Sequence, residues 1–241
     1  MPGAGNHEET DMIRLACLDM AGTTVLDDGA VADAFDASLS ASGLSAGSGD
    51  YDAAVRYVHE TMGQSKIEVF RSIFDGDPHR ADTANAAFEA AYVEAIRSNR
   101  VAPIPHAAET IEKLRGSGCA VVLTTGFAPG TRDQIIAALG WGDLITHALS
   151  PADAGRGRPY PDMVLTALLR TGTEAVDQIA VAGDTTSDLW AGSRAGAAIV
   201  AGVRTGAHGD ADFATVPHTH VLDSVADLVA RIDTHNQAVS R

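Results

Sequence analysis

Residues 13–24 read IRLACLDMAGTT, an apolar run that ends in Asp19 and passes into a turn of glycine and threonine. A short apolar run bounded by a turn is typical of a buried strand. The same pattern recurs, in places more weakly, over 119–124 (CAVVLT), 178–182 (QIAVA), 197–203 and 219–222. Helical patterns lie between these runs, over 107–115, 131–139, 161–170, 187–195 and 224–232. The alternation predicts an α/β fold whose Rossmann-like core is a parallel sheet with helices on both faces.

Residues 27–102 interrupt this alternation, because their apolar spacing is helical throughout. Four helices are predicted there, over 31–39, 52–62, 66–74 and 81–96. We therefore expect a helical cap domain at 27–102, inserted into a core domain that comprises 1–26 and 103–241. Pro103 and Pro105 are expected to mark the return to the core.

Composition limits the classes of partner. The formal net charge of −15 argues against nucleic acid and against anionic membrane surfaces. A small anionic substrate remains compatible, since a local pocket of basic groups and metal can override the global field. Cys17 and Cys119 lie in strand-like runs and are interpreted as reduced core thiols. No signal-peptide pattern and no membrane-spanning run is recognised, so a cytoplasmic location is expected.

Polar residues follow the predicted strands, at the edge of the sheet where such folds bind ligands. Asp19 ends the first strand, Thr125 and Gly126 follow the second, and Asp184 follows the third, with Asp188 four residues later. Each has an ordinary structural explanation as a helix cap or turn residue. Together with Arg158, they also supply what phosphoryl transfer to a carboxylate requires. The requirements are a nucleophile, hard oxygen ligands for magnesium, and an anion cradle.

The order of these motifs resembles the haloacid dehalogenase superfamily from about residue 13 onward. More narrowly, DMAGTTV (19–25), TTGF (124–127), GRPYP (157–161) and GDTTSD (183–188) are similar to the phosphonoacetaldehyde hydrolases. The resemblance implies that Asp19 is both nucleophile and magnesium ligand. The other implied magnesium ligands are the backbone carbonyl of Ala21, Asp184 and Asp188. The implied phosphate- and substrate-binding residues are Ala21, Gly22, Thr23, Met62, Thr125, Gly126 and Arg158.

Ala21 occupies the position where typical phosphatases of this superfamily carry a second Asp that protonates the leaving oxygen. Loss of such a general acid commonly costs ~10²–10⁴ in rate. Lys66 offers an alternative chemistry, since it and Lys113 are the only lysines among 17 basic residues. A primary amine can form an imine and a guanidinium cannot. Lys113 lies on a polar helix face and is interpreted as solvated.

Residues 62–67 (MGQSKI) resemble the phosphonatase segment that carries the Schiff-base lysine. The resulting hypothesis is cleavage of a carbon–phosphorus bond, in phosphonoacetaldehyde or a related phosphonate, through an imine on Lys66. Val69 and Phe127 depart from the phosphonatase pattern, which has a His and a Tyr at those positions. Both changes remove polar groups near the imine, and His59 or Tyr57 are the candidates to compensate.

Three other functions stay open at this point. One is a phosphatase that releases phosphate from a small phosphomonoester without the usual acid. The second is a phosphoacceptor module in which the aspartyl phosphate is a signal, although such a module needs no helical insertion. The third, a halide-releasing dehalogenase, would leave the acidic residues of GDTTSD without a metal to bind. A homodimer through the cap is implied by the resemblance alone.

Overall fold

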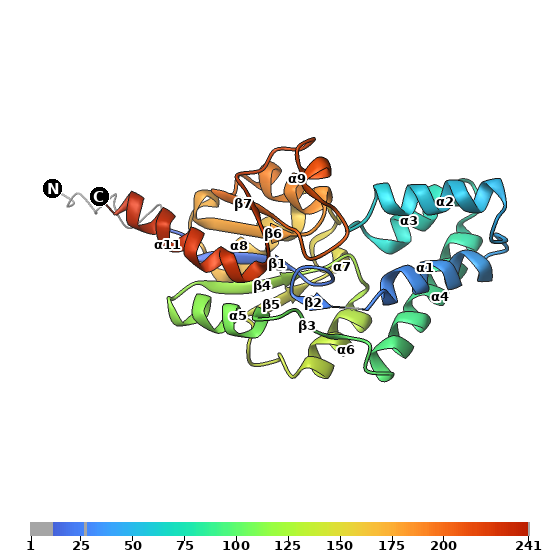
Figure 1. Ribbon diagram of the computed structural model, residues 1–241, viewed down its shortest axis with the longest axis horizontal. Coiled ribbons are helices and arrows are strands. Elements are labelled where there is room, and N and C mark those ends of the chain that lie inside the picture. The colour runs from blue at the N-terminus through green and yellow to red at the C-terminus, as the bar shows by residue number, and fades with distance from the viewer. Residues whose placement is uncertain (1–11, 27, 241) are drawn as a thin grey trace.

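A six-stranded parallel sheet forms the centre of the computed structural model, which describes residues 12–26 and 28–240. Its strands lie in the order β5-β4-β1-β6-β7-β8, with β1 in the interior (Figure 1). Their bounds are β1 Leu15–Asp19, β4 Ala120–Thr124, β5 His147–Leu149, β6 Ile179–Gly183, β7 Ile199–Val203 and β8 His220–Leu222. The predicted α/β core is therefore confirmed, because all five strands expected from the sequence are present.

Helices cover both faces of the sheet, and β1 shows why. Leu15 and Cys17 point to one face and pack with α8 (Asp162–Thr171) and α9 (Thr186–Ala195). Ala16 and Leu18 point to the other face and share a core with α5, α6 and α11. The bounds of these three helices are α5 Ala107–Gly116, α6 Pro129–Leu139 and α11 Leu228–Val239. A strand buried on both sides has no polar alternation, which explains the continuous apolar run in the sequence.

Four helices fill the stretch between β1 and the rest of the sheet, and they gather at the opposite end of the molecule from α11 (Figure 1). They are α1 Ala30–Ala41, α2 Gly49–Glu60, α3 Lys66–Ile73 and α4 Pro78–Arg97, and are called the cap helices below. Aromatic rings join three of them: Phe35 of α1 lies 4.7 Å from Phe88 of α4 and 5.6 Å from Phe70 of α3, between ring centroids. The four helices predicted over 31–96 are thus present, and their apolar faces pack on one another in a cluster that continues into the core of the sheet.

Short elements were not foreseen from the sequence. The strand β5 joins the sheet edge, and β2 (Val25–Leu26) pairs antiparallel with β3 (Ala102–Pro103). This two-stranded ribbon links both chain passages between the sheet and the cap helices, and Pro103 belongs to it. Two single-turn helices, α7 (Pro151–Ala154) and α10 (Asp210–Phe213), were also missed.

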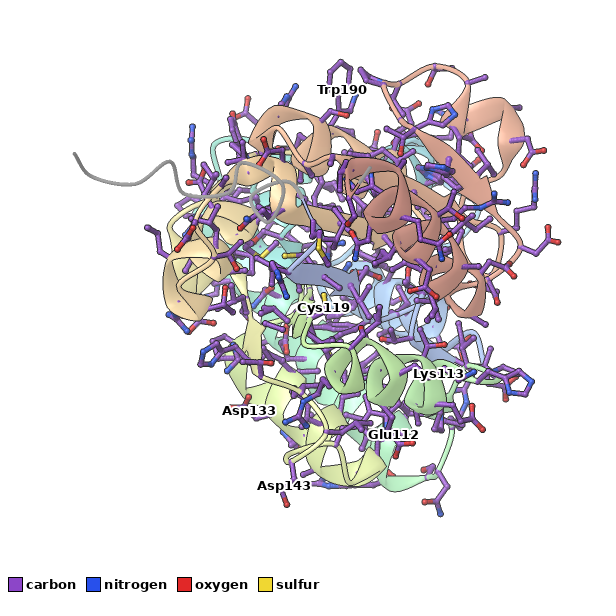
Figure 2. The ribbon with its side chains drawn as sticks, turned by 90° about the vertical axis from the view of Figure 1, so that its left-hand side faces the viewer. Glu112, Lys113, Cys119, Asp133, Asp143 and Trp190 are labelled. Carbon is purple, nitrogen blue, oxygen red and sulfur yellow. The ribbon has the colours of Figure 1, made fainter. Side chains whose placement is uncertain are left out.

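Two predictions about single residues can be checked directly. Cys17 and Cys119 are buried and form no disulfide, and Figure 2 shows Cys119 close to the sheet. Lys113 is exposed on α5, as Figure 2 also shows, in agreement with its interpretation as a solvated lysine.

Across the described part of the chain, every helix is too short or too polar to cross a lipid bilayer.

Candidate active site

Three buried carboxylates meet at the carboxyl ends of the central strands. Asp19 is the last residue of β1, and Asp184 directly follows β6, the neighbouring strand. Asp188 lies in the first turn of α9, where its Oδ2 accepts hydrogen bonds from the backbone N–H and the hydroxyl of Thr185. One oxygen of each carboxylate lies within 4.8 Å of the others. The structure therefore brings together the three predicted acidic metal ligands.

Asp184 is held by the loop that follows β7 and by the turn that follows β1. The Ala207 N–H donates to its Oδ2 at 2.7 Å, and the Thr23 hydroxyl donates to its Oδ1 at 3.3 Å. A Cβ atom on Gly22 would lie 2.4 Å from Oδ2, and one on Gly206 would lie 2.0 Å from it. These positions require glycine, because any side chain would displace the carboxylate.

Crowding of these acids suits a divalent cation. Burial, and after it the negative charge of Asp19, raises the pKa of Asp184 to about 7. Desolvated neighbouring carboxylates repel each other, and a cation between them relieves that repulsion. Oxygen donors of this kind are the ligands of hard ions such as Mg²⁺. The three residues could thus hold a metal ion.

Arg158 is in direct contact with Asp19. Its side chain is buried, its Nη1 lies 2.6 Å from Asp19 Oδ1, and the same nitrogen bonds Asp188. Its Nε is buried and has no hydrogen-bond partner among the described residues. One donor of the guanidinium is therefore unsatisfied beside these carboxylates.

Thr125 and Gly126 follow β4 next to these groups. The Thr125 backbone N–H donates to Leu149 O at 3.0 Å, and its hydroxyl oxygen accepts from the Phe127 N–H at 3.2 Å. The hydroxyl proton of Thr125 remains available for a further acceptor. Both residues line one cavity of about 320 Å³ together with Asp19, Arg158 and Asp184.

Most of the predicted binding residues line that cavity, including Ala21, Gly22 and Met62. Thr23 does not, since it is fully buried and bonds Asp184. Some wall residues were not anticipated. They are Val25, Leu26 and Gly29 near the ribbon, Val31 and Ala32 on α1, Gly63, Thr185, and the loop Thr205–Ala207. The loop at 205–207 follows a predicted strand, and this position could have marked it as part of the site. The apolar lining residues carry no comparable signal in the sequence.

Lys66 reaches the same cavity from the cap helices. It is the first residue of α3 and is 6% exposed. Its Nζ lies 5.2 Å from the ring centroid of Phe35, 5.5 Å from that of Phe127 and 5.7 Å from that of Phe88. No carboxylate of the described residues forms an ion pair with it. Burial, and after it the charge of Arg158, lowers the pKa of Lys66 to about 8.

Two glycines allow the loop before α3 to lie in close contact with the loops that follow β4 and β6. The Lys66 N–H donates to Gly126 O at 3.4 Å, and a Cβ on Gly126 would lie 2.2 Å from Gln64 O. A Cβ on Gly63 would likewise lie 2.4 Å from the Thr185 hydroxyl. The loop at 63–66 therefore rests directly on Gly126 and Thr185, and these contacts set the position of the lysine.

The positions that depart from the phosphonatase pattern are apolar in the structure as well. Val69 is buried in the hydrophobic cluster that the cap helices share with the sheet, and Phe127 packs with Tyr92 at 4.4 Å between ring centroids. Tyr57 and His59 are not among the described residues that line the cavity. The His59 ring instead lies 5.5 Å from that of His208. Neither residue is placed to compensate for the missing polar groups.

Comparisons with known proteins agree with this geometry. The model of the haloacid dehalogenase-like hydrolase family matches residues 13–196. A phosphonoacetaldehyde hydrolase from Nitratidesulfovibrio vulgaris is 27% identical, over 91% of this chain and 83% of that protein. Among solved structures, a phosphonoacetaldehyde hydrolase-like protein from Oleispira antarctica superposes with a TM-score of 0.78 at 23% identity, over 96% of this chain and 95% of that one. A predicted phosphoglycolate phosphatase from Haemophilus somnus gives 0.74 at 20% identity, over 91% and 97%.

Proposed function

Since this chain belongs to the haloacid dehalogenase-like hydrolases, we propose that it is a magnesium-dependent hydrolase that cleaves the carbon–phosphorus bond of a carbonyl phosphonate such as phosphonoacetaldehyde. The observation that carries the proposal is the buried Lys66 amine, which lines the same cavity as the Asp19 carboxylate. Asp19 acts as the nucleophile toward phosphorus, and Lys66 activates the carbon side of the bond.

The surroundings of Lys66 favour a neutral amine, which is the form that attacks a carbonyl. Burial among three aromatic rings, together with the Arg158 charge, lowers the pKa of Lys66 to about 8. Burial and Arg158 outweigh the attraction that Asp19, Glu89 and Asp184 exert on an ammonium group in the same place. These features support a reactive lysine rather than a structural one.

The reaction balances in four steps. The Lys66 amine condenses with the substrate carbonyl, releasing water and leaving an iminium. An Asp19 oxygen attacks phosphorus, and the electrons of the carbon–phosphorus bond move into the iminium to give an enamine. The enamine takes a proton at carbon and is hydrolysed to the carbonyl product and free Lys66. A second water hydrolyses the aspartyl phosphate and regenerates Asp19.

Arg158 and Thr125 orient the phosphoryl group during this sequence. The guanidinium of Arg158 and the hydroxyl proton of Thr125, both in the cavity wall, are the donors for its oxygens. Asp19, Asp184 and Asp188, with the backbone carbonyl of Ala21, would hold the magnesium ion. When bound, Mg²⁺ neutralises charge on the phosphoryl oxygens and on the carboxylates. No general acid is required at Ala21, because a carbon–phosphorus bond has no leaving oxygen to protonate.

The alternative is a phosphatase acting on a small phosphomonoester. The likeness to phosphatase structures is at 20% identity and concerns the fold alone. That activity would have to proceed without an acid at position 21, and it leaves Lys66 without a chemical task. We therefore prefer the phosphonate reaction, and the two are separated by one substitution.

The test is phosphate release from phosphonoacetaldehyde and from a panel of phosphate esters, with magnesium and with a chelator. Lys66→Arg is expected to lose activity on the carbonyl phosphonate to background, because a guanidinium cannot form the imine. Lys113→Arg is the matched control, since Lys113 is exposed on α5 (Figure 2) and does not line the cavity. Full activity of Lys66→Arg on phosphate esters, with none of the wild-type enzyme on phosphonates, would establish the phosphatase instead.

A further inference from the structure

The cavity beside Lys66 continues beyond the groups that the proposed reaction uses. Its volume of about 320 Å³ falls within the ~300–1,000 Å³ typical of sites for drug-sized ligands. A two-carbon aldehyde with one phosphonate group needs only a part of that space. The remainder lies along a wall of apolar side chains, and its chemistry indicates what else the substrate carries.

One face of α1 and the ribbon strand β2 form this wall. Val31 stands one helical turn before Phe35, the residue whose ring approaches the Lys66 amine, so the two share a face of α1. Leu26 of β2 lines the cavity although its side chain is 47% exposed. A large exposed apolar side chain at a cavity mouth gains stability when a ligand covers it. Ala32 and Met62 extend the same wall.

Among the described residues, this cavity offers a second negative group no unoccupied cationic side chain. Lys66 and Arg158 are the only cationic side chains among the described residues that line it. Arg158 already contacts Asp19 and Asp188, and Lys66 is taken up by the imine. The Thr205 hydroxyl is also engaged, since it donates to Gly22 O at 2.6 Å. A carboxylate placed against this wall would form no ion pair with a described side chain, and the apolar contact would cost it part of its hydration.

We propose that the preferred substrate is a β-ketophosphonate whose carbonyl carbon carries an uncharged alkyl substituent, which lies against Leu26, Val31 and Met62. This inference rests on the proposed function and narrows its substrate class. The overall reaction stays balanced: water and the ketophosphonate give the methyl ketone and phosphate. The substituent adds contact with the wall and takes no part in bond breaking.

Two measurements test the substrate class. In the first, calorimetry with magnesium compares a series of simple alkylphosphonates of increasing length with carboxyalkylphosphonates of matched length. Affinity is expected to rise roughly fourfold for each methylene that the wall buries, and the carboxylate is expected to abolish that gain. A flat series, or equal binding of the carboxylates, would overturn the inference whatever the enzyme cleaves.

In the second measurement, cleavage of acetonylphosphonate and its longer homologues is compared with that of phosphonopyruvate. We expect KM to fall along the ketone series and phosphonopyruvate to be the poorest substrate. Val31→Arg adds the missing cation, and it is expected to raise kcat/KM for phosphonopyruvate relative to acetonylphosphonate by about tenfold.

If KM rises along the series while phosphonoacetaldehyde is cleaved, the substrate class is wrong but the proposed function survives. If no carbonyl phosphonate releases phosphate, the proposed function fails, and the calorimetric series alone decides the preference of the wall.

Discussion

The surroundings of the Lys66 amine determine the pH at which it becomes neutral. Three aromatic rings enclose it, and the positive charge of Arg158 adds to the effect of burial. Because the pKa is lowered to about 8, the neutral fraction of the amine increases as pH rises through that value. A free lysine would become neutral only near ~10.4. The folded protein thus makes the nucleophilic amine accessible close to neutral pH.

We therefore predict that kcat/KM for a carbonyl phosphonate increases with pH and levels off above about pH 8, where Lys66 is mostly neutral. The profile is obtained from initial rates at saturating magnesium. Circular dichroism at each pH distinguishes titration from unfolding. A rate that declines steadily from acidic to alkaline pH would be incompatible with a neutral Lys66 nucleophile.

In the proposed reaction, Asp19 is the group that attacks phosphorus. Asp19→Asn keeps the shape of the side chain and removes its nucleophilic charge. Phosphate release is expected to drop by about 10⁴-fold or more, as for other covalent nucleophiles. Because Asp19 also pairs with Arg158, the stability of the Asp19→Asn variant should be compared with that of the wild-type protein by thermal denaturation. Turnover within tenfold of wild type in a correctly folded variant would exclude an aspartyl phosphate on this residue.

At the scale of elements, the adjacency of β1, β4 and β6 creates the site. Their carboxyl ends deliver Asp19, Thr125 and Asp184 to one edge of the sheet. The loop at 63–66 then closes on that edge from the cap helices. We propose that residues 27–102 form a cap domain that opens to admit substrate, with the β2–β3 ribbon as its connection to the core.

The role of the close contact between Gly126 and this loop can be tested by adding one methyl group at Gly126. In Gly126→Ala the new Cβ would lie 2.2 Å from Gln64 O, so the loop that positions Lys66 must shift. A displacement of this kind is expected to lower kcat/KM by about a hundredfold. Gly130→Ala is the matched control, because its Cβ would meet nothing within 4 Å. Equal activity of the two variants would show that the contact has no part in positioning.

The sequence was informative where chemistry is local and less so where it arises from packing. Asp19, Asp184 and Arg158 could be predicted, since each follows a recognisable apolar run or motif. The aromatic enclosure of Lys66 could not, because Phe35, Phe88 and Phe127 come from three separate segments that meet only in the fold. The edge strand β5 was missed because three residues are too few for a periodic signal.

The two residues that depart from the phosphonatase pattern illustrate the same limit. Val69 and Phe127 lack the polar groups that the phosphonatase pattern has at these positions. From the sequence, His59 and Tyr57 were the candidates to replace those groups. The structure places His59 against His208 instead, outside the cavity. The site that results is more apolar around the amine than the motifs alone indicate.

At the scale of the whole molecule, we expect the buried acidic triad to destabilise the fold and a bound metal ion to relieve that destabilisation. The three carboxylates lie within 4.8 Å of one another, and the chain carries a formal charge of −15. Magnesium at ~100 times its dissociation constant is expected to stabilise the folded protein by about 2.7 kcal/mol. The melting temperature should therefore rise by several degrees over that in a chelator.

Asp184→Asn provides the comparison for this thermal shift. The variant lacks one carboxylate of the triad, so its melting temperature should respond less to magnesium than that of wild type. A monovalent salt at equal ionic strength separates metal binding at the site from general screening of charge. Calcium, which prefers more ligands than magnesium, tests the selectivity of the site. An equal shift in the variant and the wild-type protein would place the metal elsewhere.

The most direct test of the account is reductive trapping of the imine. Wild-type protein is incubated with phosphonoacetaldehyde and magnesium, reduced with borohydride, digested with trypsin and analysed by mass spectrometry. We predict an ethyl or phosphonoethyl group on the Nζ of Lys66, within an uncut peptide spanning 57–71, and an unmodified Lys113. Phosphate release with Lys66 unmodified after borohydride treatment would contradict the imine mechanism.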